Sequence, residues 1–137
     1  MSLSNIFAVA GSGMSAQSTR LNTTASNLAN VNSVDGDPAR VYRARQPVFA
    51  AVFDSLRGDG ANVGVRTLGV VQKHGEPEAV YEPGNPLANA EGYIYHASID
   101  PVEEMANMMS AARSFQNNVE VLNTTKQLML NTIRLGD

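Results

Sequence analysis

Residues 100–135 read DPVEEMANMMSAARSFQNNVEVLNTTKQLMLNTIRL, and this stretch decides the fold. Asp100 is a favourable N-cap residue, and Pro101 suits the first helical position because its fixed backbone angle is already helical. Glu103 follows three residues after the cap, as in a capping box, and its charge complements the helix dipole. These signals predict a helix that begins at Pro101.

The other end of this stretch carries the signals of a helix C-terminus. Arg134 lies in the last turn, where a positive charge is favourable, and Gly136 can end the helix in a left-handed conformation. Between Pro101 and Gly136 the sequence has neither Pro nor Gly. We therefore predict one helix over 101–135, about 50 Å long at 1.5 Å per residue.

The apolar residues of this helix repeat every seven positions, which is the spacing of a coiled-coil seam. One series comprises Met108, Phe115, Leu122 and Met129. The other comprises Met105, Ala112, Val119, Lys126 and Ile133, and its lysine interrupts the seam. The spacing predicts a long helix that pairs with another helix.

The N-terminal segment has the same periodicity. One heptad series is Phe7, Met14, Leu21 and Leu28, and the other is Leu3, Ala10, Gln17, Thr24 and Val31. Gly11 and Gly13 each weaken a helix by about 1 kcal/mol relative to Ala, and we interpret them as a flexible point. Because such a helix is marginal alone in water, we expect it to need a partner.

The middle of the chain has the composition of short strands. Segments 40–53 and 63–71 are rich in β-formers, and Arg57-Gly58-Asp59-Gly60 between them is a turn signal, so we predict a β-hairpin. Pro47 should lie at an edge or a bulge. Pro83-Gly84-Asn85-Pro86 predicts a turn, and residues 93–95 predict a short extended segment.

These patterns predict a mainly α fold with a small β-rich middle. The expected organisation is an N-terminal coiled-coil helix over 1–34, a β-rich middle over 35–99 and a C-terminal coiled-coil helix over 100–137. The two helices would pair as a coiled coil and form one α domain, with the hairpin and extended segments inserted between them.

Composition excludes several function classes. The chain has 137 residues, 10 basic and 13 acidic, so its net charge of −3 provides no basic surface for nucleic acid. Cysteine is absent, which excludes disulfides and thiol chemistry. Apolar runs are too short to span a membrane, and the N-terminus lacks the features of a cleaved signal peptide.

Candidate chemical sites are weak. His74 and His96 do not supply the ligand count of a zinc site, and Ser12 lacks the glycine spacing of a nucleophile elbow. Glu103 and Glu104 are adjacent, so they point to different sides of a helix. We therefore expect neither catalytic residues nor a cofactor nor a bound metal. An enzyme would require a deep pocket that places one of the two histidines beside a carboxylate.

The apolar residues outside the seams indicate an interaction function. Val9, Met109, Val121, Leu128 and Leu130 would stay exposed in a single subunit, and exposed apolar patches mark protein–protein interfaces. Contacts between like subunits that do not close into a ring build a helical tube. We predict a structural filament subunit. A soluble coiled-coil interaction module, which would stop at a closed dimer, is the alternative.

Several motifs resemble the flagellar rod and hook axial proteins, and the resemblance is strongest to the proximal-rod branch. Asn27-Leu28-Ala29-Asn30 is similar to the rod motif of the whole family. Pro83-Gly84-Asn85-Pro86 lies in a segment similar to one particular to the proximal-rod branch, and residues 100–124 are similar almost throughout. The short middle region distinguishes the chain from hook proteins, which carry large insertions there.

The resemblance implies a non-enzymatic subunit of the rod that crosses the bacterial periplasm. It implies export through the flagellar type III apparatus without cleavage of a signal peptide. The expected partners are further copies of the chain, the rod proteins FlgB, FlgF and FlgG, and the adaptor FliE. A different rod or axial subunit of the flagellum is the alternative within the family.

Overall fold

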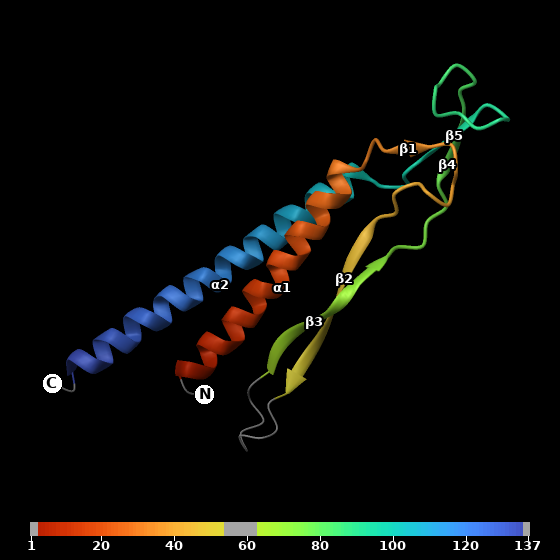
Figure 1. The fold of residues 1–137 in the computed structure, drawn as a ribbon. Helices are drawn as coiled ribbons and strands as arrows, with labels where there is room; N and C mark the ends of the chain where they lie inside the picture. Colours follow the sequence, from red (N-terminus) through yellow and green to blue (C-terminus); the bar gives the residue numbers. More distant parts are fainter. Residues whose placement is uncertain (1–2, 54–62, 136–137) are drawn as a thin grey trace.

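The computed structural model describes residues 3–53 and 63–135 (Figure 1). Helix α1 (Leu3–Ala29) lies antiparallel beside helix α2 (Pro101–Leu135). Its other side contacts a hairpin of strands β2 (Arg45–Phe53) and β3 (Val63–Gln72). Among the described helices and strands, α2 packs only against α1. The predicted combination of two long helices and a small β-rich middle is confirmed.

Helix α2 has the predicted start and end. The Oδ1 atom of Asp100 accepts hydrogen bonds from the backbone N–H groups of Val102 at 2.8 Å and Glu103 at 3.4 Å, so Asp100 is the N-cap. The Glu103 carboxylate, for which the sequence suggested a capping-box role, lies 3.5 Å from Nζ of Lys73. Gly136, the predicted C-cap, lies outside the described residues.

Helix α1 ends at Ala29, within the segment predicted as helical, and Val31 lies in the turn that follows. The helix is continuous through Gly11 and Gly13. A Cβ on Gly13 would lie only 3.0 Å from Nδ2 of Asn118 on α2. Gly13 is therefore a close-packing position between the helices.

The predicted hairpin is confirmed, with β2 starting at Arg45 rather than at residue 40. The strands are antiparallel from the Arg45–Gln72 pair to the Phe53–Val63 pair, with a bulge after Val48. The proposed turn residues Arg57 to Gly60 lie outside the described residues.

Pro47 occupies a position that does not need an N–H group for the ladder. The Lys73 N–H donates to the Ala44 carbonyl at 2.7 Å, so Ala44 faces β3. Backbone groups alternate along a strand, which makes Arg45 and Pro47 face away from β3. The predicted edge position of Pro47 is thereby confirmed.

A second sheet lies beyond the ends of the helices (Figure 1). Its antiparallel strands are β1 (Val34–Asp35), β4 (Glu78–Tyr81) and β5 (Tyr93–His96), in the order β1-β5-β4. The sequence indicated β5 alone. Strands β1 and β4 are short, and only their pairing with β5 makes them strands. Ile94 on β5 is 1% exposed and anchors this sheet.

The buried apolar core is small and rich in alanine. Its members are Ala10, Ala16, Val41, Ala44, Ile94, Ala97 and Ala111. Small residues let the helix backbones approach closely, and Ala111, which is 0% exposed, leaves no room for a larger side chain.

Replacing Ala111 with leucine is expected to destabilise the fold by about 1–3 kcal/mol, since overpacking forces the two helices apart. Thermal unfolding followed by circular dichroism measures the change. Ala106→Leu is the matched control, because Ala106 is an exposed residue of the same helix and should change stability by less than about 0.5 kcal/mol. Equal melting temperatures for Ala111→Leu and the unmodified chain would contradict this packing.

Candidate assembly interface

The predicted seam residues of α1 line its contacts only in part. Phe7, Met14, Leu21 and Leu28 are all half-buried. The fully buried residues of α1 are Ala10, Ala16, Thr23, Thr24 and Asn27, and of these Ala10 and Thr24 belong to the second predicted heptad series. The large apolar residues therefore border the contacts of α1, and small or polar residues occupy their centre.

The same holds for α2. In the series predicted as one half of its seam, Met108, Phe115, Leu122 and Met129 are half-buried. The fully buried residues are Glu104, Ala111 and Thr125, which together with half-buried Asn118 form a series one residue before the other predicted half. The face of α2 that meets α1 therefore differs from the face predicted from the heptad spacing of apolar residues, and the two are offset by one residue in this series.

The predicted seam residues Met105, Val119 and Ile133 lie outside this buried series. Met105 is 49% exposed, Ile133 is 59% exposed, and Val119 is half-buried. Ile133 lies near the C-terminal end of α2, which extends past the described start of α1 (Figure 1). Both side chains keep about half or more of their surface exposed, and any role for them in assembly stays a prediction.

Polar contacts join the two helices. Nη2 of Arg20 donates to Oδ1 of Asn107 at 2.9 Å, and Nδ2 of Asn27 donates to Oε2 of Glu104 at 3.1 Å. Glu104 is 7% exposed, so this contact is shielded from solvent. Such specific hydrogen bonds fix the register of the pair more tightly than apolar contacts, which tolerate sliding.

Asn27 is the central residue of this arrangement. It is 1% exposed, and its amide oxygen accepts from the Arg45 backbone N–H at 2.8 Å and from the Tyr42 hydroxyl at 3.0 Å. Its amide nitrogen donates to the Arg45 carbonyl at 2.9 Å as well as to Glu104. All four hydrogen-bonding positions of the amide are used, so this one side chain joins α1, α2 and β2.

The rest of the rod motif has a local role in this structure. Leu28 is half-buried, Ala29 is exposed, and Nδ2 of Asn30 donates to the Ser26 carbonyl at 2.8 Å. Sequence reasoning singled out Asn27 through the motif but gave it no partner. The other buried residues of α1 are alanines and threonines, so a larger amide among them was the available sign that Asn27 has partners elsewhere in the chain.

The second motif forms the predicted turn. The Asn85 N–H donates to the Glu82 carbonyl at 3.0 Å, and Oδ1 of Asn85 accepts from the Leu87 N–H at 3.0 Å. Pro83, Gly84 and Pro86 are exposed around it. The turn packs closely on the segment after α1, because a Cβ on Gly36 would lie 2.5 Å from the Leu87 carbonyl oxygen.

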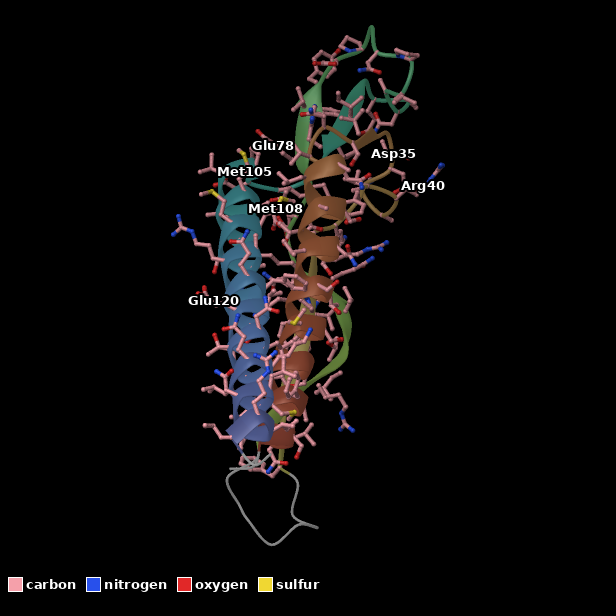
Figure 2. The ribbon with its side chains drawn as sticks, turned by 90° about the vertical axis from the view of Figure 1, so that its left-hand side faces the viewer. Asp35, Arg40, Glu78, Met105, Met108 and Glu120 are labelled. Carbon is pink, nitrogen blue, oxygen red and sulfur yellow. The ribbon has the colours of Figure 1, made fainter. Side chains whose placement is uncertain are left out.

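Large apolar residues of α2 that remain exposed lie on several sides of the helix, and together they are here called its outer face. They are Val102, Met105, Met109, Val121, Leu128, Leu130, Ile133 and Leu135. Figure 2 shows Met105 and Glu120 projecting from α2 on the side away from α1. The expected exposure of Met109, Val121, Leu128 and Leu130 is confirmed, whereas Val9 is half-buried.

The hairpin adds a second exposed apolar surface. Its members are Val48, Val52, Phe53, Val63, Val65, Leu68, Val70 and Val71. Soluble monomers seldom expose so many large apolar side chains on neighbouring elements. The outer face of α2 and the hairpin are therefore the surfaces best suited to contact other proteins.

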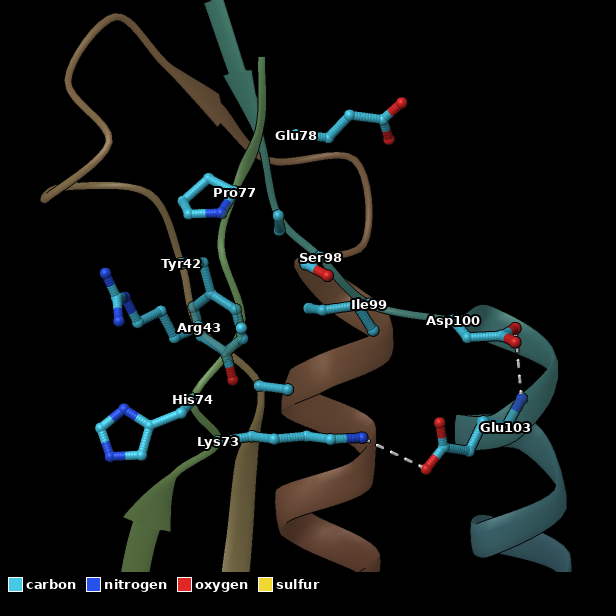
Figure 3. A pocket seen from close by; sticks show the side chains of 13 residues that line it. Tyr42, Arg43, Lys73, His74, Pro77, Glu78, Ser98, Ile99, Asp100 and Glu103 are labelled. Atoms are coloured by element: carbon cyan, nitrogen blue, oxygen red, sulfur yellow. Dashed lines mark hydrogen bonds and ion pairs between the residues drawn. The ribbon is translucent and has the colours of Figure 1, made fainter.

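An open cleft of about 400 Å³ lies where the helices meet the β-rich middle. Tyr42, Lys73, His74 and Asp100 are among its lining residues, and Lys73 pairs with Glu103 across it. In Figure 3 the exposed His74 points away from the Asp100 and Glu103 carboxylates. His96, on β5, does not line this cleft.

The described residues contain no group of three or more His, Cys, Asp or Glu side chains that could hold a metal ion. Within the same part of the chain, neither helix combines the length and apolar character that a bilayer-spanning segment requires.

Comparison with known proteins matches both ends of the chain to flagellar families. Residues 7–36 match the family described as "Flagella basal body rod protein". Residues 90–135 match the family described as "Flagellar basal body rod FlgEFG protein C-terminal". The first range includes Asn27 and most of α1, and the second includes all of α2.

Full-length relatives carry the same description. The chain is 52% identical over 136 residues to the "Flagellar basal-body rod protein FlgC" of Salmonella typhimurium (strain LT2), covering 99% of both chains. It is 51% identical, with the same coverage, to the FlgC of Escherichia coli O6:H1. The FlgC of Buchnera aphidicola subsp. Acyrthosiphon pisum is 40% identical over 139 residues and 100% of both chains. Together with the two-helix fold, this similarity shows that the chain belongs to the FlgC family of flagellar basal-body rod proteins.

Proposed function

We propose that this chain is a structural subunit of the proximal rod, which assembles through its terminal helices into a helical tube that crosses the periplasm. Membership of the family supports a location in the flagellar basal-body rod. The single observation that carries assembly is the outer face of α2. Helix α2 has 35 residues and, among the described helices and strands, packs against α1 alone, which leaves most of its circumference for neighbouring subunits.

The proposed building block is an α domain formed by residues 1–34 and 100–137, with residues 35–99 as a separate middle region. In this proposal the terminal helices pair as a coiled coil. The half-buried residues Met14, Leu21, Phe115 and Leu122 border their contact, and Met105 and Ile133 are left for neighbouring subunits.

The proposed partners are further copies of the chain, the rod proteins FlgB, FlgF and FlgG, and the adaptor FliE. We also propose export through the flagellar type III apparatus without signal cleavage. The role needs neither catalysis nor a cofactor, which agrees with relatives named as rod proteins. Neighbouring subunits would bury apolar surface on the outer face of α2, and each Å² removed from water would stabilise the assembly by about 25 cal/mol.

Basal bodies purified from a flagellated strain that produces an epitope-tagged copy test this function. The tagged chain is expected to co-purify with the rod and to be lost when the rod is disassembled by acid. Sedimentation of the purified chain over a range of concentrations tests the alternative. A species that stops at a dimer, together with tag-free basal bodies, would favour a soluble interaction module. Tag found only in another segment of the axial structure would identify a different axial subunit.

A further inference from the structure

The hairpin is attached to α1 through backbone groups at its edges. Arg45 and Pro47 face away from β3, as the Ala44–Lys73 hydrogen bond requires. Continuing the alternation along β2 places Ala51 in the same outward orientation. Val65 pairs with Ala51, so its backbone groups also face outward, at the outer edge of β3. The backbone N–H and C=O groups of Arg45 and Val65 can thus bond to whatever lies beside the hairpin.

Polar side chains of α1 occupy both positions. At the β2 edge, Asn27 accepts from the Arg45 N–H at 2.8 Å and donates to the Arg45 carbonyl at 2.9 Å, as an adjacent strand would. At the β3 edge, Oγ of Ser12 accepts from the Val65 N–H at 3.1 Å. The Ser12 hydroxyl donates its own hydrogen to the Val9 carbonyl at 2.7 Å, which leaves its oxygen oriented toward the strand.

The close approach at Ser12 also depends on its neighbour in β3. A Cβ on Gly64 would lie 3.3 Å from Oγ of Ser12, closer than most such contacts. Glycine at this position therefore lets the strand come within hydrogen-bonding distance of the helix. Most large apolar side chains of the hairpin are exposed, so burial of apolar surface does little to fix where the hairpin lies on α1.

We propose that Ser12 and Asn27 are positioning residues that hold the hairpin on α1 by replacing a neighbouring strand at each of its two edges. Asn27 holds the base of the hairpin, and Ser12 holds a point nearer its tip. Two separated attachments fix both the position and the direction of the hairpin. The polar attachments, rather than apolar packing, set the angle at which its exposed valines face other molecules. This inference does not rest on the proposed function.

Amide hydrogen exchange of the full chain, measured by NMR, tests the proposal. Ser12→Ala is expected to raise the exchange rate of the Val65 amide about 3- to 10-fold, as the loss of one ordinary hydrogen bond predicts, without changing the rates in α2. Gly64→Val should have the same effect from the strand side, because its side chain pushes β3 away from Ser12. Ser12→Thr, which keeps the hydroxyl group, should restore slow exchange.

Ser15→Ala is the matched control, because Ser15 is an exposed serine of the same helix and its loss should leave Val65 unchanged. The proposal is overturned if the Val65 amide exchanges at the rate of an unstructured chain in the unmodified protein. It is also overturned if Ser12→Ala and Ser15→Ala give the same exchange rate at Val65. A uniform rise at every amide would show that Ser12 supports global stability alone, and would overturn it as well.

Discussion

Asn27→Ala is expected to lower the free energy of unfolding by about 2–4 kcal/mol, more than any other single polar substitution in α1. The change leaves the Arg45 N–H and carbonyl, the Tyr42 hydroxyl and the Glu104 carboxylate without the partner that they share. Each polar group that loses its partner away from water costs about 1–3 kcal/mol, less whatever water regains at the new cavity. Urea unfolding followed by circular dichroism measures the loss.

The control for this substitution is Asn22→Ala, because Asn22 is an exposed asparagine in the same helix. Its replacement should be neutral or slightly stabilising, since alanine is the better helix former. If both substitutions change the unfolding free energy equally, Asn27 is not the junction described above.

A double-mutant cycle can separate the contact between Asn27 and Glu104 from the other three contacts of Asn27. Asn27→Asp keeps the acceptor for the Arg45 N–H and the Tyr42 hydroxyl, but it loses the donor to the Arg45 carbonyl and places a second carboxylate beside Glu104. It should therefore be destabilising at neutral pH. Adding Glu104→Gln restores a donor facing an acceptor and should recover part of the loss. A double-mutant cycle gives the coupling energy, and a value near zero would contradict a direct contact.

Leu128→Asp is expected to abolish assembly while the subunit still folds. Leu128 is 54% exposed on the outer face of α2, so the free chain can accept an aspartate there at little cost. In an assembled interface the same carboxylate would be buried without a partner, which costs several kcal/mol. At 1.4 kcal/mol per tenfold, about 3 kcal/mol weakens each contact by about 100-fold.

Swimming in soft agar and the content of purified basal bodies measure this effect, and thermal unfolding of the purified variant shows that it folds. Gln127→Asp introduces the same charge at a neighbouring exposed residue that is already polar, and it should swim normally. Leu122→Asp should lose folding and assembly together, since Leu122 is half-buried in the described structure. Normal swimming and normal incorporation of Leu128→Asp would show that this part of α2 faces solvent in the rod.

The sequence alone determined where α2 lies and that two strands form a hairpin. Asp100, Pro101 and the absence of breakers up to Gly136 fixed the extent of α2, because capping and backbone constraints act within a few residues. The β-branched residues of the hairpin likewise report a local preference. The family motifs identified Asn27 as important, although not for a reason that local rules supply.

Tertiary structure alone decided which face of α2 is buried. The heptad spacing of apolar residues predicted that Met105 and Ile133 lie in the seam, but Ala111 and Thr125 are among the buried residues of α2. On the other side of the contact, Gly13 packs closely against Asn118. Adjacent residues on a helix point about 100° apart, so an offset of one residue turns a different face toward the partner. The partner's shape makes that choice: close approach favours small residues, and a buried amide such as Asn27 is stable only where four groups from other segments meet it.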